Sequence, residues 1–375
     1  MSDAVPLAAA SPHAGEIAGL TLRGFAARLG TSPAAARAAY RQAMRTPGAL
    51  TLPPLARREE QDGVRKFCLA VPGVGDGPGL ETESVIIPMH SYRGSRWHTL
   101  CVSSQVGCRM GCTFCETGRM GLVRNLSVAE IVGQFLVARD LMLQTAPAAA
   151  RPYRYFSSGI ENIVFMGMGE PLDNFEAVSE AIRVLSEPNG LNFPHAQITV
   201  STVGRIDGLR RLAALGWPNL RIAISLNAPD DALRRALMPV NAAMPLAALR
   251  EALLAYPLAR KGYFLIEYVL MRGINDAPAQ ARAVAAWCRG LRCVVNLIPY
   301  NPQRQPRYAA PDEAAIVRFA AELRAAGVFV KRRLTKGRDL LGACGQLGNP
   351  AVAVRRGAST LATDHSAAAT DYTDN

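Results

Sequence analysis

The stretch TLCVSSQVGCRMGCTFC, residues 99–115, decides the fold. Residues 99–103 form a short β-prone run, and a glycine-containing loop with Cys108, Cys112 and Cys115 follows directly. Parallel α/β sheets carry their reactive groups just after the strands, so this C-x3-C-x2-C loop predicts a reactive site at the end of a first strand.

Five further β-prone segments follow, at residues 163–166, 198–201, 221–225, 264–270 and 293–298, and each precedes a helical stretch. After the first strand, Ser127 with Glu130 three residues later predicts a capping box at a helix start. Six strand–helix units in series favour a parallel sheet with right-handed crossovers. We therefore expect an α/β fold with a partial (β/α)6 barrel over residues 98–347.

The segments outside this barrel have other patterns. Residues 1–18 and 356–375 are rich in small and polar residues without an apolar period, so both are predicted to be disordered. Helical spacing over residues 20–44, then broken by prolines, predicts a small helical module at 19–60. Two β-prone runs, 64–71 and 83–88, predict a hairpin in a β extension at 61–97.

The amino-acid composition indicates which class of binding partner to expect. The 42 Lys and Arg against 30 Asp and Glu give a net charge of +12, which favours nucleic acid as a partner over a membrane. The alternative explanation of this charge is an arginine bias from a GC-rich genome, with the cationic side chains on an ordinary solvated surface. No apolar run could span a bilayer and no signal peptide is recognisable, so we expect a cytoplasmic protein without membrane association. Lack of coiled-coil heptads favours a monomer.

The three clustered cysteines indicate iron–sulfur chemistry. Three thiolates can bind three irons of a [4Fe-4S] cluster and leave the fourth iron open. A structural zinc site would need a fourth ligand at short spacing, which neither Cys101 nor Cys344 provides. The spacing is typical of radical S-adenosylmethionine (SAM) enzymes.

Polar residues at later strand ends predict a SAM pocket. In MGMGEPLDN, residues 166–174, the glycines would let a ligand approach the backbone, and Glu170 could accept a hydrogen bond from the SAM ammonium group. A tight turn would explain the glycines but not this carboxylate. Ser201, Ser225 and Asn301 are each ordinary turn residues when taken singly, but as a set on one barrel rim they indicate a SAM pocket.

Two cysteines remain outside the cluster motif. Cys101 ends the first strand, and Cys344 lies in GACGQ, residues 342–346, shortly after five basic residues. Neighbouring glycines and cations favour an exposed, thiolate-prone Cys344. Glu83, taken alone, would be a solvent-facing strand residue.

Four segments together resemble the RlmN/Cfr family of radical SAM adenosine methyltransferases: CVSSQVGC (101–108), MGMGEP (166–171), IPYN (298–301) and ACGQL (343–347). The resemblance extends over residues 64–347. It implies that SAM is bound by Gly169, Glu170, Ser201, Ser225, Leu226, Asn227 and Asn301. Where the family usually has Ser-Leu-His, this chain has Asn227 in the third place, which can hydrogen-bond but cannot titrate near neutral pH.

The resemblance also implies a mechanism that uses two SAM molecules per turnover. One methylates Cys344, and the second is cleaved at the cluster to a radical that abstracts hydrogen from that methyl group. The resulting carbon radical adds to adenine and gives a covalent RNA–enzyme adduct. Glu83 matches the family's proton acceptor, and Cys101 matches the cysteine that resolves the adduct through a disulfide with Cys344. A reduced donor such as flavodoxin or ferredoxin would supply electrons.

The favoured hypothesis is methylation of adenosine C2 in 23S rRNA, with tRNA as a second substrate. Methylation of C8, as in the Cfr branch, is the alternative, since Thr117-Gly118 is closer to that branch. A further alternative is a divergent paralogue that acts on another RNA or on a small heterocycle. A non-catalytic RNA-binding iron–sulfur protein is the hypothesis from a different class.

Overall fold

The computed structural model describes residues 14–75, 77–91, 94–145, 158–349 and 352. All six predicted strands form: β4 (Arg96–Cys101), β7 (Ile160–Phe165), β8 (Ile198–Thr202), β9 (Arg221–Ser225), β10 (Phe264–Leu270) and β11 (Cys293–Pro299). They lie side by side in this order and run parallel. A short strand that the sequence did not indicate, β12 (Val330–Arg332), adds to β11. The α/β class is thereby confirmed.

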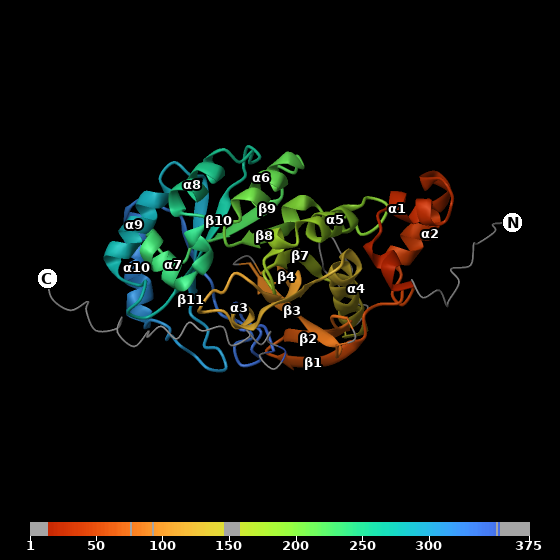
Figure 1. Ribbon diagram of the computed structural model, residues 1–375, viewed down its shortest axis with the longest axis horizontal. Coiled ribbons are helices and arrows are strands. Elements are labelled where there is room, and N and C mark those ends of the chain that lie inside the picture. The colour runs from red at the N-terminus through yellow and green to blue at the C-terminus, as the bar shows by residue number, and fades with distance from the viewer. Residues whose placement is uncertain (1–13, 76, 92–93, 146–157, 350–351, 353–375) are drawn as a thin grey trace.

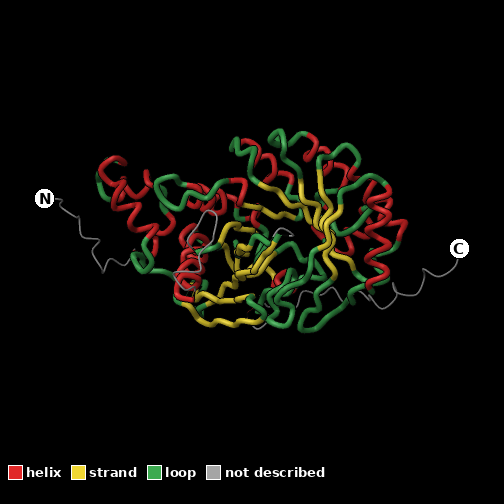
Figure 2. Tube along the Cα trace, turned by 180° about the vertical axis from the view of Figure 1, so that it is seen from behind, coloured by secondary structure: helices red, strands yellow, loops and turns green. Residues whose placement is uncertain are grey.

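Helices cover the outer side of the curved sheet (Figures 1 and 2). They are α4 (Val128–Thr145), α5 (Phe175–Ser186), α6 (Ile206–Ala214), α8 (Leu246–Leu254), α9 (Pro278–Cys288) and α10 (Glu313–Ala325). The short helix α7 (Asp231–Leu237) lies instead at the strand ends, where the carbonyl of Leu237 accepts from the N–H of Thr113 at 3.0 Å. Strand side chains alternate between the two faces. In β10, Ile266 and Tyr268 belong to the hydrophobic core, whereas Leu265, Glu267 and Val269 line cavities on the inner side.

The predicted capping box forms at the start of α4. The backbone N–H of Ser127 donates to Glu130 Oε2 at 2.8 Å, and the N–H of Glu130 donates to Ser127 Oγ at 3.3 Å. Two amides of the first helical turn are thus satisfied.

The cysteine loop lies in a small sheet that the sequence analysis did not predict. β5 (Gln105–Cys108) and β6 (Gly121–Asn125) pair antiparallel and enclose the loop with the short helix α3 (Glu116–Met120). Gly107 has φ +75°, and a Cβ there would lie 1.9 Å from the carbonyl oxygen of Gly121. Only glycine permits this close pairing.

The β extension continues the barrel sheet. β2 (Val64–Val71) and β3 (Leu80–His90) form the predicted antiparallel hairpin, and β3 pairs with β4. β1 (Leu55–Gln61) pairs with β2, so residues 55–60 are part of this sheet and not of the helical module to which the sequence assigned them. Among the described residues, β1 and β12 are the two edges of one ten-stranded sheet, so the barrel is open.

The N-terminal module contains η1 (Ala14–Gly19), α1 (Leu22–Arg28) and α2 (Pro33–Arg45), at one end of the molecule (Figure 1). The expectation of disorder is wrong for residues 14–18, because η1 packs on α4 and buries Ala18. Residues 1–13 and 356–375 lie outside the described residues. Among the helices that are described, none has the length and apolar character to cross a bilayer.

Candidate active site

The three motif cysteines line one cavity of about 150 Å³ at the end of the parallel strands. Cys108 ends β5, Cys112 lies in the loop, and Cys115 precedes α3. All three are free thiols, and burial raises the pKa of each. A metal centre bound here would supply the positive charge that favours the thiolate form.

These donors fit a cluster better than a single ion. Cys344 also lines the cavity, so four thiols face it. Yet no group of three or more His, Cys, Asp or Glu in the described part of the chain is arranged around one metal ion. Three thiolates that each bind a different iron of a cubane need not converge on one point.

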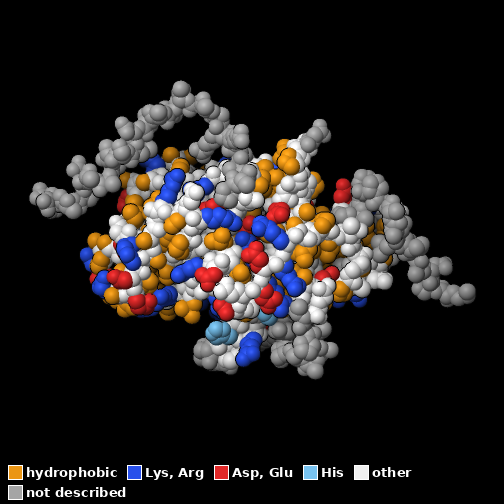
Figure 3. All heavy atoms as spheres, turned by 90° about the horizontal axis from the view of Figure 1, so that it is seen from below, with side chains coloured by type: hydrophobic (Ala, Val, Ile, Leu, Met, Phe, Trp, Pro, Cys, Tyr) orange, Lys and Arg blue, Asp and Glu red, His pale blue; other side chains and the backbone are white. Residues whose placement is uncertain are grey.

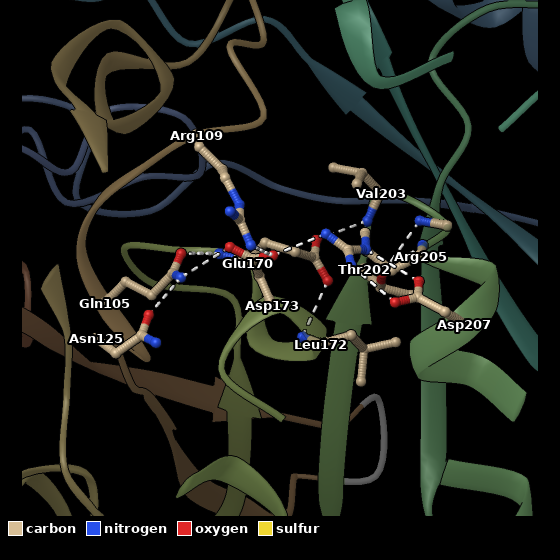
Figure 4. A network of polar contacts seen from close by, with 11 residues as sticks. Gln105, Arg109, Asn125, Glu170, Leu172, Asp173, Thr202, Val203, Arg205 and Asp207 are labelled. Atoms are coloured by element: carbon tan, nitrogen blue, oxygen red, sulfur yellow. Dashed lines mark hydrogen bonds and ion pairs between the residues drawn. The ribbon is translucent and has the colours of Figure 1, made fainter. Parts of the chain in front are cut away.

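Glu170 is buried in the wall of this cavity and is held by backbone amides (Figure 4). Its Oε1 accepts from the N–H of Leu172 at 3.1 Å, and its Oε2 accepts from the N–H of Val203 at 2.9 Å. Burial raises the pKa of Glu170 to about 7, although these hydrogen bonds lower it. The carboxylate thus links the loop after β7 to the end of β8.

Gly169 also lines the cavity. The sequence suggested that a glycine is needed here so that a ligand can approach the backbone, but the structure gives a second reason. The φ of Gly169 is +102°, and a Cβ would lie 2.7 Å from both Gln105 Cβ and Ser104 Oγ. Close packing of the loop against the start of β5, rather than ligand approach alone, therefore demands glycine here.

Asp173 is a positioning residue that the sequence analysis missed. Its buried carboxylate binds Arg109 at 2.5 Å and Arg205 at 2.7 Å, and it accepts from Gln105 Nε2 at 3.2 Å (Figure 4). Arg109 follows Cys108 directly, so Asp173 joins the cysteine loop to the loop after β8. Its place in the 166–174 segment was the only available signal.

The predicted rim residues Ser201, Ser225, Asn227 and Asn301 all line the same cavity. Asn227 has a left-handed φ of +59°, and its Oδ1 accepts from the N–H of Val269 at 2.9 Å, so this amide fixes the ends of β9 and β10. Leu226 does not reach the cavity, because its side chain is buried in the hydrophobic core. It can contribute to the site only through its backbone.

Arg234 is fully buried behind this rim and was not indicated by the sequence. Its guanidinium donates to the carbonyls of Leu226 at 3.0 Å, Ser225 at 3.0 Å and Val203 at 2.6 Å. It also donates to Asn241 Oδ1 at 2.7 Å. Burial lowers the pKa of Arg234 to about 10. One side chain thus gathers the ends of β8 and β9.

Cys344 is half-buried in an anchored loop, which differs from the exposed thiol expected from its glycines. Its carbonyl accepts from Asn301 Nδ2 at 3.1 Å. The carbonyl of the next residue, Gly345, accepts from the N–H of Glu116 at 2.8 Å, and Thr117 Oγ1 donates to the carbonyl of Leu347 at 2.5 Å. The loop therefore lies against α3 and the cysteine motif.

A second cavity, of about 450 Å³, adjoins the first on the inner side of the sheet and contains both Cys101 and Cys344. Burial raises the pKa of Cys101 to about 12, and the nearby Cys344 adds to this. Arg333 lines both cavities, and its pKa is raised chiefly by Cys344, then by Glu267 and Cys101. All eight cysteines are free, so the Cys101–Cys344 disulfide is not formed here.

Glu83 is buried, contrary to the solvent-facing position expected from the strand pattern, and it lines neither of these two cavities. Its Oε2 lies 2.9 Å from Lys66 Nζ and accepts from the N–H of Gly348 at 3.3 Å. Lys66 Nζ also donates to the carbonyl of Leu341 at 3.2 Å. This ion pair ties both ends of residues 341–348 to the β2–β3 hairpin.

Three thiols placed after the first strand of an open parallel sheet, under a rim of polar strand ends, define the radical SAM class. Residues 102–283 match the model of the Radical SAM superfamily. The dual-specificity RNA methyltransferase RlmN of Phenylobacterium zucineum is 42% identical over 313 residues, 83% of this chain and 77% of its own. RlmN of Caulobacter vibrioides is 42% identical over 303 residues, 80% of this chain and 71% of its own.

The fold agrees with these relatives. The crystal structure of a radical SAM methyltransferase from Sphaerobacter thermophilus superposes with a TM-score of 0.76 at 36% identity, covering 88% of this chain and 98% of that one. This chain belongs to the RlmN/Cfr family of radical SAM RNA methyltransferases.

Proposed function

We propose that this enzyme methylates an adenosine carbon, C2, in 23S rRNA and in tRNA, through a methyl group carried on Cys344 and a covalent RNA–enzyme intermediate. One observation carries the proposal: Cys344 lines both the cavity of the cluster cysteines and the cavity of Cys101. A sulfur that takes up a methyl group on one side and delivers a carbon to a base on the other needs this position.

The described residues have distinct roles in this scheme. A [4Fe-4S] cluster held by Cys108, Cys112 and Cys115 supplies, when bound, the electron for reductive SAM cleavage. Gly169, Glu170, Ser201, Ser225, Asn227, Asn301 and the backbone of Leu226 form the proposed SAM site. Two SAM molecules are consumed per turnover, and flavodoxin or ferredoxin is the proposed electron donor.

Cys344 and Cys101 act in sequence. Arg333 lines both cavities and interacts electrostatically with Cys344, the proposed acceptor of the first methyl group. Asn301 holds the carbonyl of Cys344 and so fixes the sulfur-bearing loop between the cavities. Cys101 shares the larger cavity with Cys344 and is the proposed resolving thiol, which attacks the Cys344 sulfur to release the methylated RNA.

Glu83 is the proposed proton acceptor on the strength of the family resemblance. Its Oε2 contacts Lys66 and Gly348, and it lies outside the two cavities that contain Cys344. Residues 341–348 must therefore shift before this carboxylate can take a proton from a bound base.

Charge around the larger cavity supports an RNA substrate. Arg221, Lys331, Arg332 and Lys336 line it, and the first three are exposed. On the face shown in Figure 3, cationic and acidic side chains are intermixed. We also propose a cytoplasmic monomer that contains the helical module, the β extension and the barrel.

The test is mass spectrometry of cluster-loaded protein together with the variant Cys101→Ala. We expect a methyl group on Cys344 and a trapped covalent RNA adduct in Cys101→Ala. The matched control Cys288→Ala removes a buried cysteine that lines neither of these two cavities and should trap nothing. Unmodified Cys344 and no adduct, with SAM still cleaved, would retain the radical SAM class and refute RNA methylation through Cys344.

The same experiment separates the alternatives. Mass mapping of the methylated nucleoside distinguishes C2 from the C8 product of the Cfr branch. Activity on a small purine-like heterocycle, with none on RNA, would indicate the divergent paralogue. Formation of 5′-deoxyadenosine under reducing conditions excludes a purely binding protein.

A further inference from the structure

Glu267 is a buried carboxylate to which the proposed mechanism gives no role. It lies on β10 between Leu265 and Val269, which face the same inner side. It is only 5% exposed, and burial raises its pKa. A buried carboxylate is costly unless each oxygen has a hydrogen-bond donor and the charge is compensated, so the partners of Glu267 need to be accounted for.

Half of this carboxylate is satisfied and half is not. Oε2 accepts from Asn296 Nδ2 on the neighbouring strand β11 at 2.8 Å. Oε1 is buried and has no hydrogen-bond partner. Glu267 also lines both cavities, so its Oε1 is a hydrogen-bond acceptor without a donor at the place where the two cavities meet.

The neighbours of Glu267 show which ligand would reach it. Val269 lines only the cluster cavity, and Leu265 lines only the larger cavity of Cys101. Arg333 is close enough to interact electrostatically with Glu267, Cys344 and Cys101 alike. If the reacting base lies within reach of both cysteines, as the proposed function requires, it lies beside Glu267.

We infer that Glu267 recognises the target base as adenine, by accepting a hydrogen bond from its exocyclic 6-amino group at Oε1. Asn296 fixes the orientation of the carboxylate, and Arg333 compensates its charge. The larger cavity, about 450 Å³, lies within the range of roughly 300–1,000 Å³ of small-molecule sites and has room for an unstacked base. A 6-oxo purine would place an acceptor against this acceptor and would be rejected. The inference rests on the proposed function.

The test compares two 23S rRNA fragments, one with adenine and one with unsubstituted purine at the target position, which differ only in the 6-amino group. Wild-type enzyme should bind the adenine RNA about tenfold or more tightly, as expected for a hydrogen bond to a charged group. Glu267→Met removes the acceptor at similar volume, and its ratio of the two dissociation constants should fall to near one.

Two further variants keep the test decisive. Glu161→Met makes the same change on β7, at a residue that lines neither of these cavities, and should keep the wild-type ratio. In Glu267→Gln the amide oxygen should face Asn296 and the NH2 group the cavity, so this variant should disfavour adenine RNA even if Glu267→Met does not fold.

The outcomes distinguish adenine recognition by Glu267 from the proposed function, adenosine methylation, on which it rests. Unchanged ratios in both Glu267 variants would refute base recognition, although adenine methylation by the wild type would stand. Loss of SAM binding with unchanged ratios would make Glu267 a SAM contact instead. Absence of adenine methylation by the wild type would overturn the proposed function, and the inference with it.

Discussion

At the scale of single residues, buried polar groups hold the site more than its glycines do. Arg234 has no exposed surface and donates to three strand-end carbonyls, a role that its sequence position on a short helix does not reveal. In sequence it resembles any surface arginine beside Arg235. Long-range partners of this kind appear only when the fold brings strand ends together.

Gly169→Ala should destabilise the protein and weaken SAM binding. The new Cβ would meet Gln105 and Ser104 at 2.7 Å in addition to adopting φ +102°. We expect about 1–3 kcal/mol lost in the free energy of unfolding, measured by chemical denaturation. The matched control is Gly30→Ala, at φ +62° with open space around it, which isolates the conformational cost. Equal effects at both glycines would contradict the packing argument.

At the scale of elements, the six barrel strands were predictable from the sequence, whereas β12 and the β5–β6 pair were not. All six barrel strands and the Ser127–Glu130 capping box follow from local apolar runs and turn residues. β12 was missed because a strand of three residues shows too little alternation to be recognised. The β5–β6 pair was missed because its two short strands are separated in the sequence by the cysteine loop and α3. The predicted cavity-lining residues were found largely because they follow strands, whereas Asp173, Glu267 and Arg333 depend on tertiary contacts.

Asp173→Asn should loosen the cysteine loop. The change removes the charge that holds Arg109 and Arg205, while the size of the side chain stays the same. We expect purified protein to retain less iron and to lose its cluster faster in air, measured as iron per chain and visible absorbance. Asp207→Asn also loses a partner of Arg205 but does not touch the cysteine loop, so it should retain iron normally. Normal iron content in Asp173→Asn would show that the link is dispensable.

Lys66→Met should loosen both ends of residues 341–348 and remove the nearer cation of the buried Glu83, which keeps the more distant Arg57 at 3.8 Å. Breaking a buried pair costs about 3–5 kcal/mol, and adding Glu83→Gln should recover part of this loss. Hydrogen exchange should rise in residues 341–348 and stay unchanged in α9. The exposed control Lys261→Met should alter neither quantity. Unchanged exchange in the loop would mean that its other contacts, with α3, Asn301, Pro302 and Arg304, are sufficient to hold it.

At the scale of the whole molecule, the net charge of +12 should govern RNA affinity. Release of counterions predicts that affinity falls by about tenfold or more as salt rises from roughly 50 to 200 mM. Lys331→Gln should reduce the log–log slope by about one if Lys331 contacts a phosphate, whereas Lys261→Gln should not. Filter binding across a salt series measures both. A flat salt dependence would contradict phosphate-dominated binding.

The position of Cys344 along the chain has a consequence for biogenesis. Strands β4 to β11, with the three motif cysteines and the polar residues at the strand ends, are synthesised before β12 and residues 341–348. A nascent polypeptide therefore carries most of the cavity lining before it carries Arg333, Cys344 and Gly345, which complete that lining. The proposed methyl acceptor therefore joins the site only after the parallel strands have been synthesised.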